Sequence, residues 1–245
     1  MLCRDVGAGN KVRDEIRAQV PGASLRVLEC DLASFASVRE CADNIRRLDR
    51  IDVLINNAGI VSTRRKRSVD GFELTFATNY LGPFLLTRLL LDRMTPTGRI
   101  INVASRAHFR GKLDLDDVRD RHARYGSIAA YARSKLANVC HTFALARRLS
   151  ATQMTANCLH PGVVATNLLP RWVRVVKPLL SKAIFDAERG AKTTLYLALS
   201  GDVANVSGCY FDENQDIRPA AAIARDTERQ DWLWNMSEGW VDGGA

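Results

Sequence analysis

Tyr131 and Lys135 have residue types and a spacing that suit proton transfer. The surrounding residues 128–149 have apolar and small side chains at helical spacing, which predicts one long helix. Residues four apart on a helix lie on the same face, one turn apart. A tyrosine phenol ionises at about pH 10, and a neighbouring cation favours the phenolate, lowering the phenol pKa by roughly 1–3 units. The pair therefore predicts an acid–base site; the alternative is a surface tyrosine beside a solvated lysine.

The composition predicts one folded domain spanning residues 1–245, because 47% of the residues are hydrophobic and 25% are charged. The net charge of +8 suits an anionic ligand, but the basic residues are spread along the chain. They lack the aromatic-interleaved pattern of nucleic-acid binding. The six cysteines form no CxxC pair and no metal-like spacing with the four histidines, so we expect no metal site and a reducing compartment. No apolar run is long enough to span a bilayer.

Short apolar runs alternate with longer helical patterns along the chain. The predicted strands are residues 25–30, 51–55, 99–103, 155–159 and 208–211. The predicted helices are residues 9–20, 34–48, 69–91, 128–149 and 186–199, with one more after Pro219. This alternation predicts βαβ units, and hence an α/β fold with a parallel sheet covered by helices on both faces.

Small or hydrogen-bonding residues follow four of these strands. They are Asp31, the Asn-Asn-Ala-Gly run at 56–59, Ser105, and the His-Pro-Gly run at 160–162. Because ligands bind at the carboxyl ends of the strands in such sheets, the pattern predicts a small-ligand site at this edge.

Taken in order, these motifs resemble those of the short-chain dehydrogenase/reductase family, and the sequence is most similar to the retinol dehydrogenase group. The resemblance covers about residues 1–238 and implies a Rossmann-like, doubly wound parallel sheet. It implies a catalytic tetrad of Asn79, Ser105, Tyr131 and Lys135. The cofactor-binding positions that it implies are Arg4, Asp31, Leu32, Asn57, Ala58, Gly59, Tyr131, Lys135, Pro161, Gly162, Val164 and Thr166.

The resemblance also implies a role for each residue of the tetrad. Ser105 donates a hydrogen bond to the substrate oxygen, and Tyr131 gives or takes the hydroxyl proton. Lys135 keeps the tyrosine pKa low and binds the nicotinamide ribose, while Asn79 holds a water that relays the proton. The cofactor supplies the hydride chemistry, so no metal is needed.

The family's glycine-rich phosphate turn, TGxxxGxG, is absent from the sequence. In the family register residues 1–5 match the end of the second strand, and Arg4 matches the residue that pairs with the adenosine 2′-phosphate, which predicts NADP(H). We therefore expect a chain that is incomplete at its N-terminus, with the first strand and the glycine-rich turn missing. This loss either leaves two facing strand edges unpaired or brings their strands together, and it weakens cofactor binding.

Two segments are expected near the substrate. Residues 111–117 should form a loop or short helix at the substrate mouth, and residues 168–184 a lid with apolar and basic residues interleaved. Such a lid suits a lipophilic substrate taken from a membrane surface; the alternative is a lid packed on its own domain. The leading hypothesis is an NADP(H)-dependent enzyme that interconverts a lipophilic, retinoid-like alcohol and its aldehyde or ketone.

Two alternatives stay open. One is a carbonyl or steroid reductase with the same chemistry. The other is a catalytically silent, truncated partner subunit that dimerises through the helices bearing Asn79 and Tyr131.

The expected partners are a small lipophilic alcohol or carbonyl substrate, a membrane surface and a second copy in a homodimer, and no nucleic acid. The expected location is the cytoplasm, or the endoplasmic reticulum or mitochondrial surface. His108 and His160 are interpreted as non-catalytic.

Overall fold

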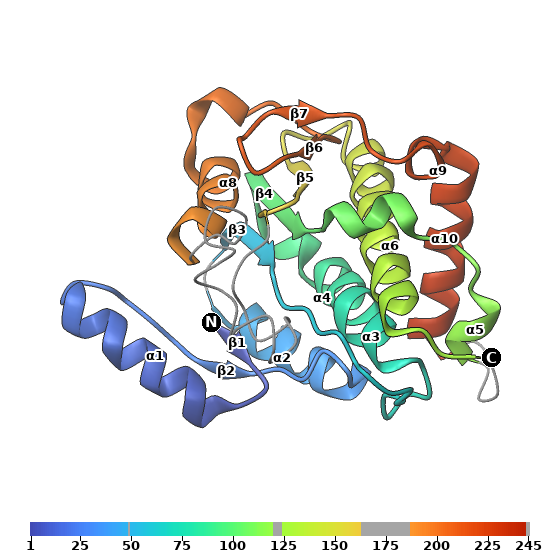
Figure 1. The fold of residues 1–245 in the computed structure, drawn as a ribbon. Helices are drawn as coiled ribbons and strands as arrows, with labels where there is room; N and C mark the ends of the chain where they lie inside the picture. The colour runs from blue at the N-terminus through green and yellow to red at the C-terminus, as the bar shows by residue number, and fades with distance from the viewer. Residues whose placement is uncertain (49, 120–123, 163–186, 244–245) are drawn as a thin grey trace, which may run out of the picture.

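The computed structural model describes residues 1–48, 50–119, 124–162 and 187–243, in which a parallel sheet is flanked by helices (Figure 1). The strands are β1 (Leu2–Cys3), β2 (Leu28–Glu29), β3 (Ile51–Asn56), β4 (Met94–Val103), β5 (Thr155–Leu159), β6 (Tyr210–Phe211) and β7 (Ile217–Arg218). The α-helices are α1 (Val6–Gln19), α2 (Phe35–Arg46), α3 (Leu74–Phe76), α4 (Gly82–Leu90), α5 (Asp116–Arg119), α6 (Ser127–Arg148), α8 (Ala187–Leu199), α9 (Ala222–Arg225) and α10 (Thr227–Val241). Shorter turns are the π-helix η1 (Ala77–Leu81) and the 3-10 helices η2 (Leu91–Arg93), η3 (Arg106–Arg110) and η5 (Gly201–Val203).

The main sheet has the order β3-β4-β5-β6-β7. Its first four strands run parallel, and β7 returns antiparallel to β6. All five residues of β5 are buried, because helices cover both faces of this central strand. The predicted α/β class, the parallel sheet and each of the five predicted strands are confirmed, with β2 and β6 shorter than predicted. The sequence did not predict β7, which is only two residues long.

The sheet is divided into two pieces. β1 and β2 pair in parallel with each other, in a two-stranded sheet separate from the main one. Within the described residues β3 pairs only with β4, and Ile55 on this edge strand is 41% exposed. Of the two outcomes predicted for this place, the structure has unpaired edges rather than β1 joined to β3. Helix α1 accordingly buries only Gly9 and extends away from the other helices (Figure 1).

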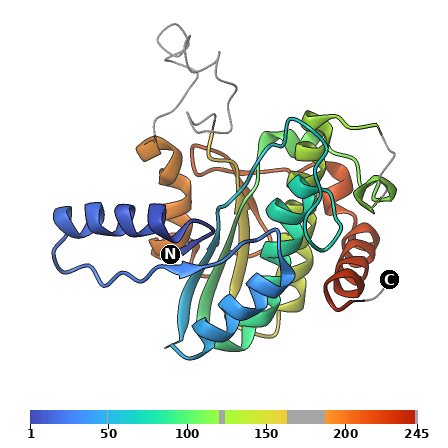
Figure 2. The ribbon, with the colours of Figure 1, turned by 90° about the horizontal axis from the view of Figure 1, so that it is seen from below.

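Two helical layers enclose the main sheet. The larger core lies on the side of α2, α4, α6 and α10. The smaller core lies under α8 and contains Ile101, Val103, Leu159, Leu197 and Phe211. The predicted helices on both faces are therefore confirmed (Figure 2).

The helix predicted at residues 69–91 begins later and contains a π-helix. Val69 is 82% exposed, in a turn that continues to Gly71 with a φ of 87°. The buried Glu73 carboxylate accepts hydrogen bonds from the backbone N–H groups of Thr75 (2.7 Å) and Phe76 (2.9 Å), so the helix begins at residue 74. The five-residue π-helix η1 then separates α3 from α4.

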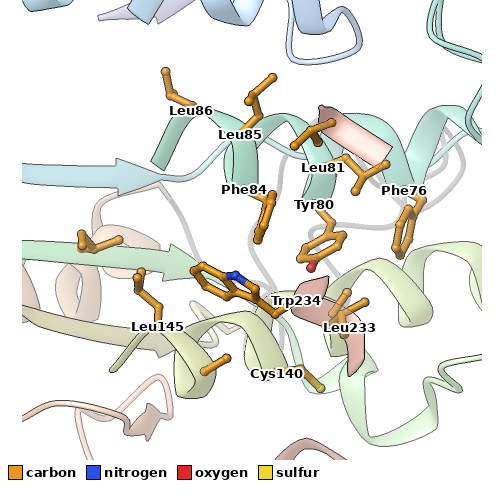
Figure 3. Packing of buried hydrophobic residues seen from close by; sticks show 14 of the residues in the cluster. Phe76, Tyr80, Leu81, Phe84, Leu85, Leu86, Cys140, Leu145, Leu233 and Trp234 are labelled. Atoms are coloured by element: carbon orange, nitrogen blue, oxygen red, sulfur yellow. The ribbon is translucent and has the colours of Figure 1, made fainter. Parts of the chain in front are cut away.

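Helix α10 covers the outer face of α4 and α6. Trp234 of α10 packs edge-on against Phe84, with 5.1 Å between ring centroids (Figure 3). Its ring also stacks on His141 at 5.4 Å. The hydroxyl groups of Tyr80 and Ser237 are 2.8 Å apart. The face that was expected to pair with a second subunit is thus occupied by the chain's own C-terminal helix. A homodimer stays a prediction.

Among the described residues, none of the helices combines the length and the apolar character that crossing a membrane requires.

Candidate active site

The four residues of the predicted tetrad come from three elements that meet beside the end of β4. Ser105 follows β4 and caps η3, where its hydroxyl accepts from the N–H of Ala107 at 3.2 Å. Tyr131 and Lys135 lie on α6, and Asn79 lies in the π-helix η1. Parallel pairing of β3, β4 and β5 brings the carboxyl ends of these strands to one edge.

Asn79 is buried (1% exposed) and makes three hydrogen bonds with its side chain. Its Oδ1 accepts from the N–H of Ile60 at 2.7 Å, and its Nδ2 donates to the carbonyl of Ile60 at 2.9 Å. Nδ2 also donates to the Ser134 hydroxyl at 3.0 Å, which itself donates to the Tyr131 carbonyl at 2.8 Å. Asn79 therefore joins the loop after β3 to the helix that bears the tyrosine. A π-helix at such a residue is typical of functional sites.

Lys135 is a buried cation (3% exposed) at the end of β4. Its ammonium donates to the carbonyl of Val103 at 2.7 Å. Burial lowers the pKa of Lys135 to about 8. A Cβ atom placed on Gly59 would lie 3.4 Å from this ammonium and 3.6 Å from Oδ1 of Asn79, so these two polar groups converge on the backbone of Gly59.

The Ser105 side chain lies near enough to the Tyr131 phenol to lower its pKa, so the structure brings these two residues together. Burial raises the pKa of Tyr131, and the Ser105 side chain only partly offsets this rise. The expected lowering of this pKa by Lys135 is not found. The Lys135 ammonium lies 5.7 Å from the centre of the tyrosine ring, and its hydrogen bond is made to a backbone carbonyl instead.

The predicted cofactor positions after β3 and β5 lie at the same edge as the tetrad. Asn57 and Ala58 are exposed and Gly59 is half-buried. Pro161 and Gly162 directly follow β5, and Gly162 has a φ of 81°, which a side chain disfavours. Val164 and Thr166 lie outside the described residues, as does all of the segment 168–184, where the lid was expected.

The remaining cofactor positions follow the separate two-stranded sheet. Arg4 is exposed after β1, and Asp31 follows β2, where its carboxylate accepts from the N–H of Ala33 at 2.9 Å. Leu32 lies against α4 so closely that a Cβ on Gly82 would be 2.3 Å from the Leu32 carbonyl. The pairing of β1 with β2 therefore places Arg4 and Asp31 at the ends of adjacent strands.

These residues fit the nicotinamide end of a dinucleotide better than its phosphates. The buried ammonium of Lys135, the Tyr131 hydroxyl and the side-chain-free backbone of Gly59 form a polar cradle. No glycine-rich phosphate turn occurs in the sequence. The described residues also contain no cluster of acidic, cysteine or histidine side chains suited to a metal ion.

Three features of the structure were not predicted from the sequence. Ser134 links Asn79 to Tyr131, and only its position one residue before Lys135 could have indicated this. The segment at 111–117 is a loop that leads into the short helix α5, as predicted, but the sequence did not predict that its Leu113 and Leu115 are buried in the main core. A cavity of about 820 Å³ lies between α6, β5 and the segment before α9, and none of the tetrad lines it.

Comparison with known proteins shows which family the chain belongs to. A family model described as "short chain dehydrogenase" matches residues 1–174. The chain is 39% identical to human retinol dehydrogenase 14 over 265 aligned residues, which cover 97% of this chain and 77% of that protein.

Two solved structures are also similar. One, an uncharacterised protein from Mycobacterium paratuberculosis, has 33% identity and a TM-score of 0.78, covering 99% of this chain and 83% of that one. The other, a blue fluorescent protein from a metagenomic library in complex with NADPH, has 28% identity and a TM-score of 0.67, covering 86% and 83%.

Proposed function

Because the chain belongs to the short-chain dehydrogenase/reductase family, an oxidoreductase family, we propose that it interconverts a lipophilic, retinoid-like alcohol and its aldehyde or ketone with NADP(H). The observation that carries this proposal is the meeting of Ser105, Tyr131, Lys135 and Asn79 at the ends of β3 and β4. Hydrogen bonds fix Asn79 to the loop after β3 and to Ser134 of α6, and they fix Lys135 to Val103 at the end of β4, which preorganises these side chains.

The proposed proton transfer uses the two hydroxyl groups. Ser105 donates a hydrogen bond to the carbonyl oxygen of the substrate, where negative charge develops during reduction. Tyr131 donates the proton that completes the alcohol, and its raised pKa keeps it protonated and ready to donate at neutral pH. In the oxidation direction the same oxygen accepts the proton. The bound cofactor would supply or accept the hydride.

Lys135 would bind the cofactor, and Asn79 would hold the adjoining loop in place. The Lys135 ammonium, which lies beside Gly59, would donate to the nicotinamide ribose, and Asn79 fixes the loop that carries this glycine. With its pKa at about 8, Lys135 remains mostly charged at neutral pH. Arg4, exposed at the end of β1, would pair with the adenosine 2′-phosphate, which favours NADP(H) over NAD(H).

The retinoid-like substrate rests on the similarity to retinol dehydrogenase 14. A carbonyl or steroid reductase with the same tetrad is the alternative within this chemistry. We would compare turnover of all-trans-retinal with turnover of small aromatic ketones in the presence of NADPH. Faster reduction of the ketones, with no turnover of retinal, would refute the retinoid substrate. Membrane contact and the cellular location remain predictions.

A catalytically silent chain is the second candidate function. It is favoured by the division of the sheet between β1 and β3 and by the absence of the glycine-rich turn from the sequence. The test is the thermal-unfolding midpoint with and without NADPH. A ligand at 100 times its Kd adds about 2.7 kcal/mol to the stability of the folded state, which raises the midpoint. A raised midpoint supports the enzyme; a cooperative transition that NADPH leaves unmoved supports the silent chain.

A further inference from the structure

His108 is fully buried beside the proposed site and uses both ring nitrogens. It lies on η3, three residues after Ser105, and is 0% exposed. Its Nδ1 lies 2.7 Å from the Ser105 carbonyl, which also accepts from the backbone N–H of His108 at 3.0 Å. On the other side of the ring, Nε2 lies 3.3 Å from the backbone nitrogen of Ala221.

These two partners fix the proton on the ring. A carbonyl oxygen can only accept a hydrogen bond, so Nδ1 must bear the hydrogen that Ser105 receives. A backbone N–H can only donate, so Nε2 must offer its lone pair to Ala221. The geometry therefore requires the neutral ring with its hydrogen on Nδ1. Burial lowers the pKa of His108, which agrees with a neutral ring at physiological pH.

The segment that bears His108 is held from three sides. Its ring packs edge-on against Tyr210 of β6, with ring centroids 4.7 Å apart. At the end of η3, a Cβ atom on Gly111 would lie only 2.6 Å from the Ala132 carbonyl of α6, so the two backbones touch. The third side is Ala221, directly before α9, which packs on α6.

We propose that His108 is a positioning residue that keeps Ser105 beside Tyr131. It does so as a tether, because its ring links the Ser105 backbone to the chain segment before α9. This inference rests on the proposed roles of Ser105 and Tyr131. The tether matters because Ser105 has no regular secondary structure of its own between the end of β4 and η3. Without it, the serine loop would be free to shift, and a misplacement of about 1 Å can lower a rate by about a hundredfold.

Three variants divide the tether into its parts. His108→Phe keeps a buried ring against Tyr210 and removes both hydrogen bonds. His108→Asn offers an amide N–H near the position of Nδ1, so it can restore the bond to Ser105. Ala221→Pro removes only the backbone N–H that donates a hydrogen bond to Nε2. The φ of −51° at this residue suits proline. The matched control is His141→Phe, since neither ring nitrogen of the buried His141 has a partner among the described residues.

The first readout is the titration of the Tyr131 phenol, followed by ultraviolet difference spectra against Tyr131→Phe. Displacement of the Ser105 side chain should raise the phenol pKa further in His108→Phe and in Ala221→Pro, with partial return in His108→Asn. The control His141→Phe should leave it unchanged. An unmoved phenol titration in folded His108→Phe or, if that variant does not fold, in Ala221→Pro would overturn the proposal.

The second readout is turnover with NADPH and all-trans-retinal. His108→Phe should lower kcat by about tenfold to a hundredfold with little change in the KM for NADPH, and His108→Asn should recover most of kcat. A wild-type chain without turnover would count against the proposed function alone, because the phenol titration needs no turnover. Loss of kcat in His108→Phe that His108→Asn does not rescue, with an unmoved titration, would assign His108 a merely structural role.

Discussion

The side chain of Asn79 and the backbone of Ile60 form a reciprocal pair, with hydrogen bonds of 2.7 Å and 2.9 Å in opposite directions. The pair fastens the loop after β3 to the π-helix η1. It places Gly59, the residue before Ile60, beside the Lys135 ammonium. A side chain thus does here what a neighbouring strand does elsewhere in a sheet, by satisfying both polar groups of one backbone residue.

Asn79→Ala should damage both stability and turnover. The substitution leaves the half-buried N–H and C=O of Ile60 without these partners, which should lower the free energy of unfolding by about 1–3 kcal/mol. It also removes the bonds that hold Gly59 beside the Lys135 ammonium, so kcat should fall. Denaturant unfolding and steady-state kinetics measure the two effects. The control is Asn214→Ala in an exposed turn, for which we expect a change within about 0.5 kcal/mol. Equal stability of the two variants would contradict the role of the pair.

Lys135 should make stability depend on pH in the alkaline range. The folded chain has a pKa of about 8 for this group, whereas the unfolded chain has the ordinary value of about 10.4. Between these values the unfolded chain binds the proton and the folded chain does not, so stability rises with pH. The gain should approach about 3 kcal/mol when referred to Lys135→Met, in which the group is absent. Parallel stability curves for the two proteins from pH 7 to about pH 10.5 would rule out the lowered pKa.

Trp234→Ala should uncover the face of α4 and α6. The substitution removes a ring that packs on Phe84 and His141, and a large-to-small change in such a core costs about 3–5 kcal/mol. The apolar face exposed in this way should promote association, which sedimentation velocity would detect. The matched control is Trp232→Ala on the same helix, where the side chain is 37% exposed and the cost should be smaller. A monomeric variant of unchanged stability would contradict this account.

Gly111→Ala should lower turnover more than cofactor affinity. The new methyl group would lie 2.6 Å from the Ala132 carbonyl and 2.7 Å from Cβ of Leu136, so η3 must move away from α6. Because Ser105 caps the N-terminus of η3, we expect a loss of kcat of about tenfold or more, with the Kd for NADPH nearly unchanged. Gly201→Ala is the control, since nothing lies within 4 Å of its added methyl group. An unchanged kcat in Gly111→Ala would show that the position of Ser105 does not depend on this contact.

The sequence by itself determined the fold class and the placement of the tetrad on its elements. The alternation of strands and helices is local, and the period of apolar residues in 128–149 predicted α6 to within one residue at each end. With Tyr131 and Lys135 one helical turn apart on that helix, their common face follows from helix geometry alone. The polar ends of β3, β4 and β5 meet at one edge because parallel strands leave no other arrangement.

Only the tertiary structure decided how these groups are held and charged. The pKa of Tyr131 is raised rather than lowered, because burial outweighs a cation that donates instead to Val103. The start of the helix before Asn79 depends on the buried Glu73. The packing of α10 on α4 depends on Trp234, which lies 150 positions after its partner Phe84 in the sequence. Burial and hydrogen bonds between distant segments set these properties, and a local pattern of residues contains neither.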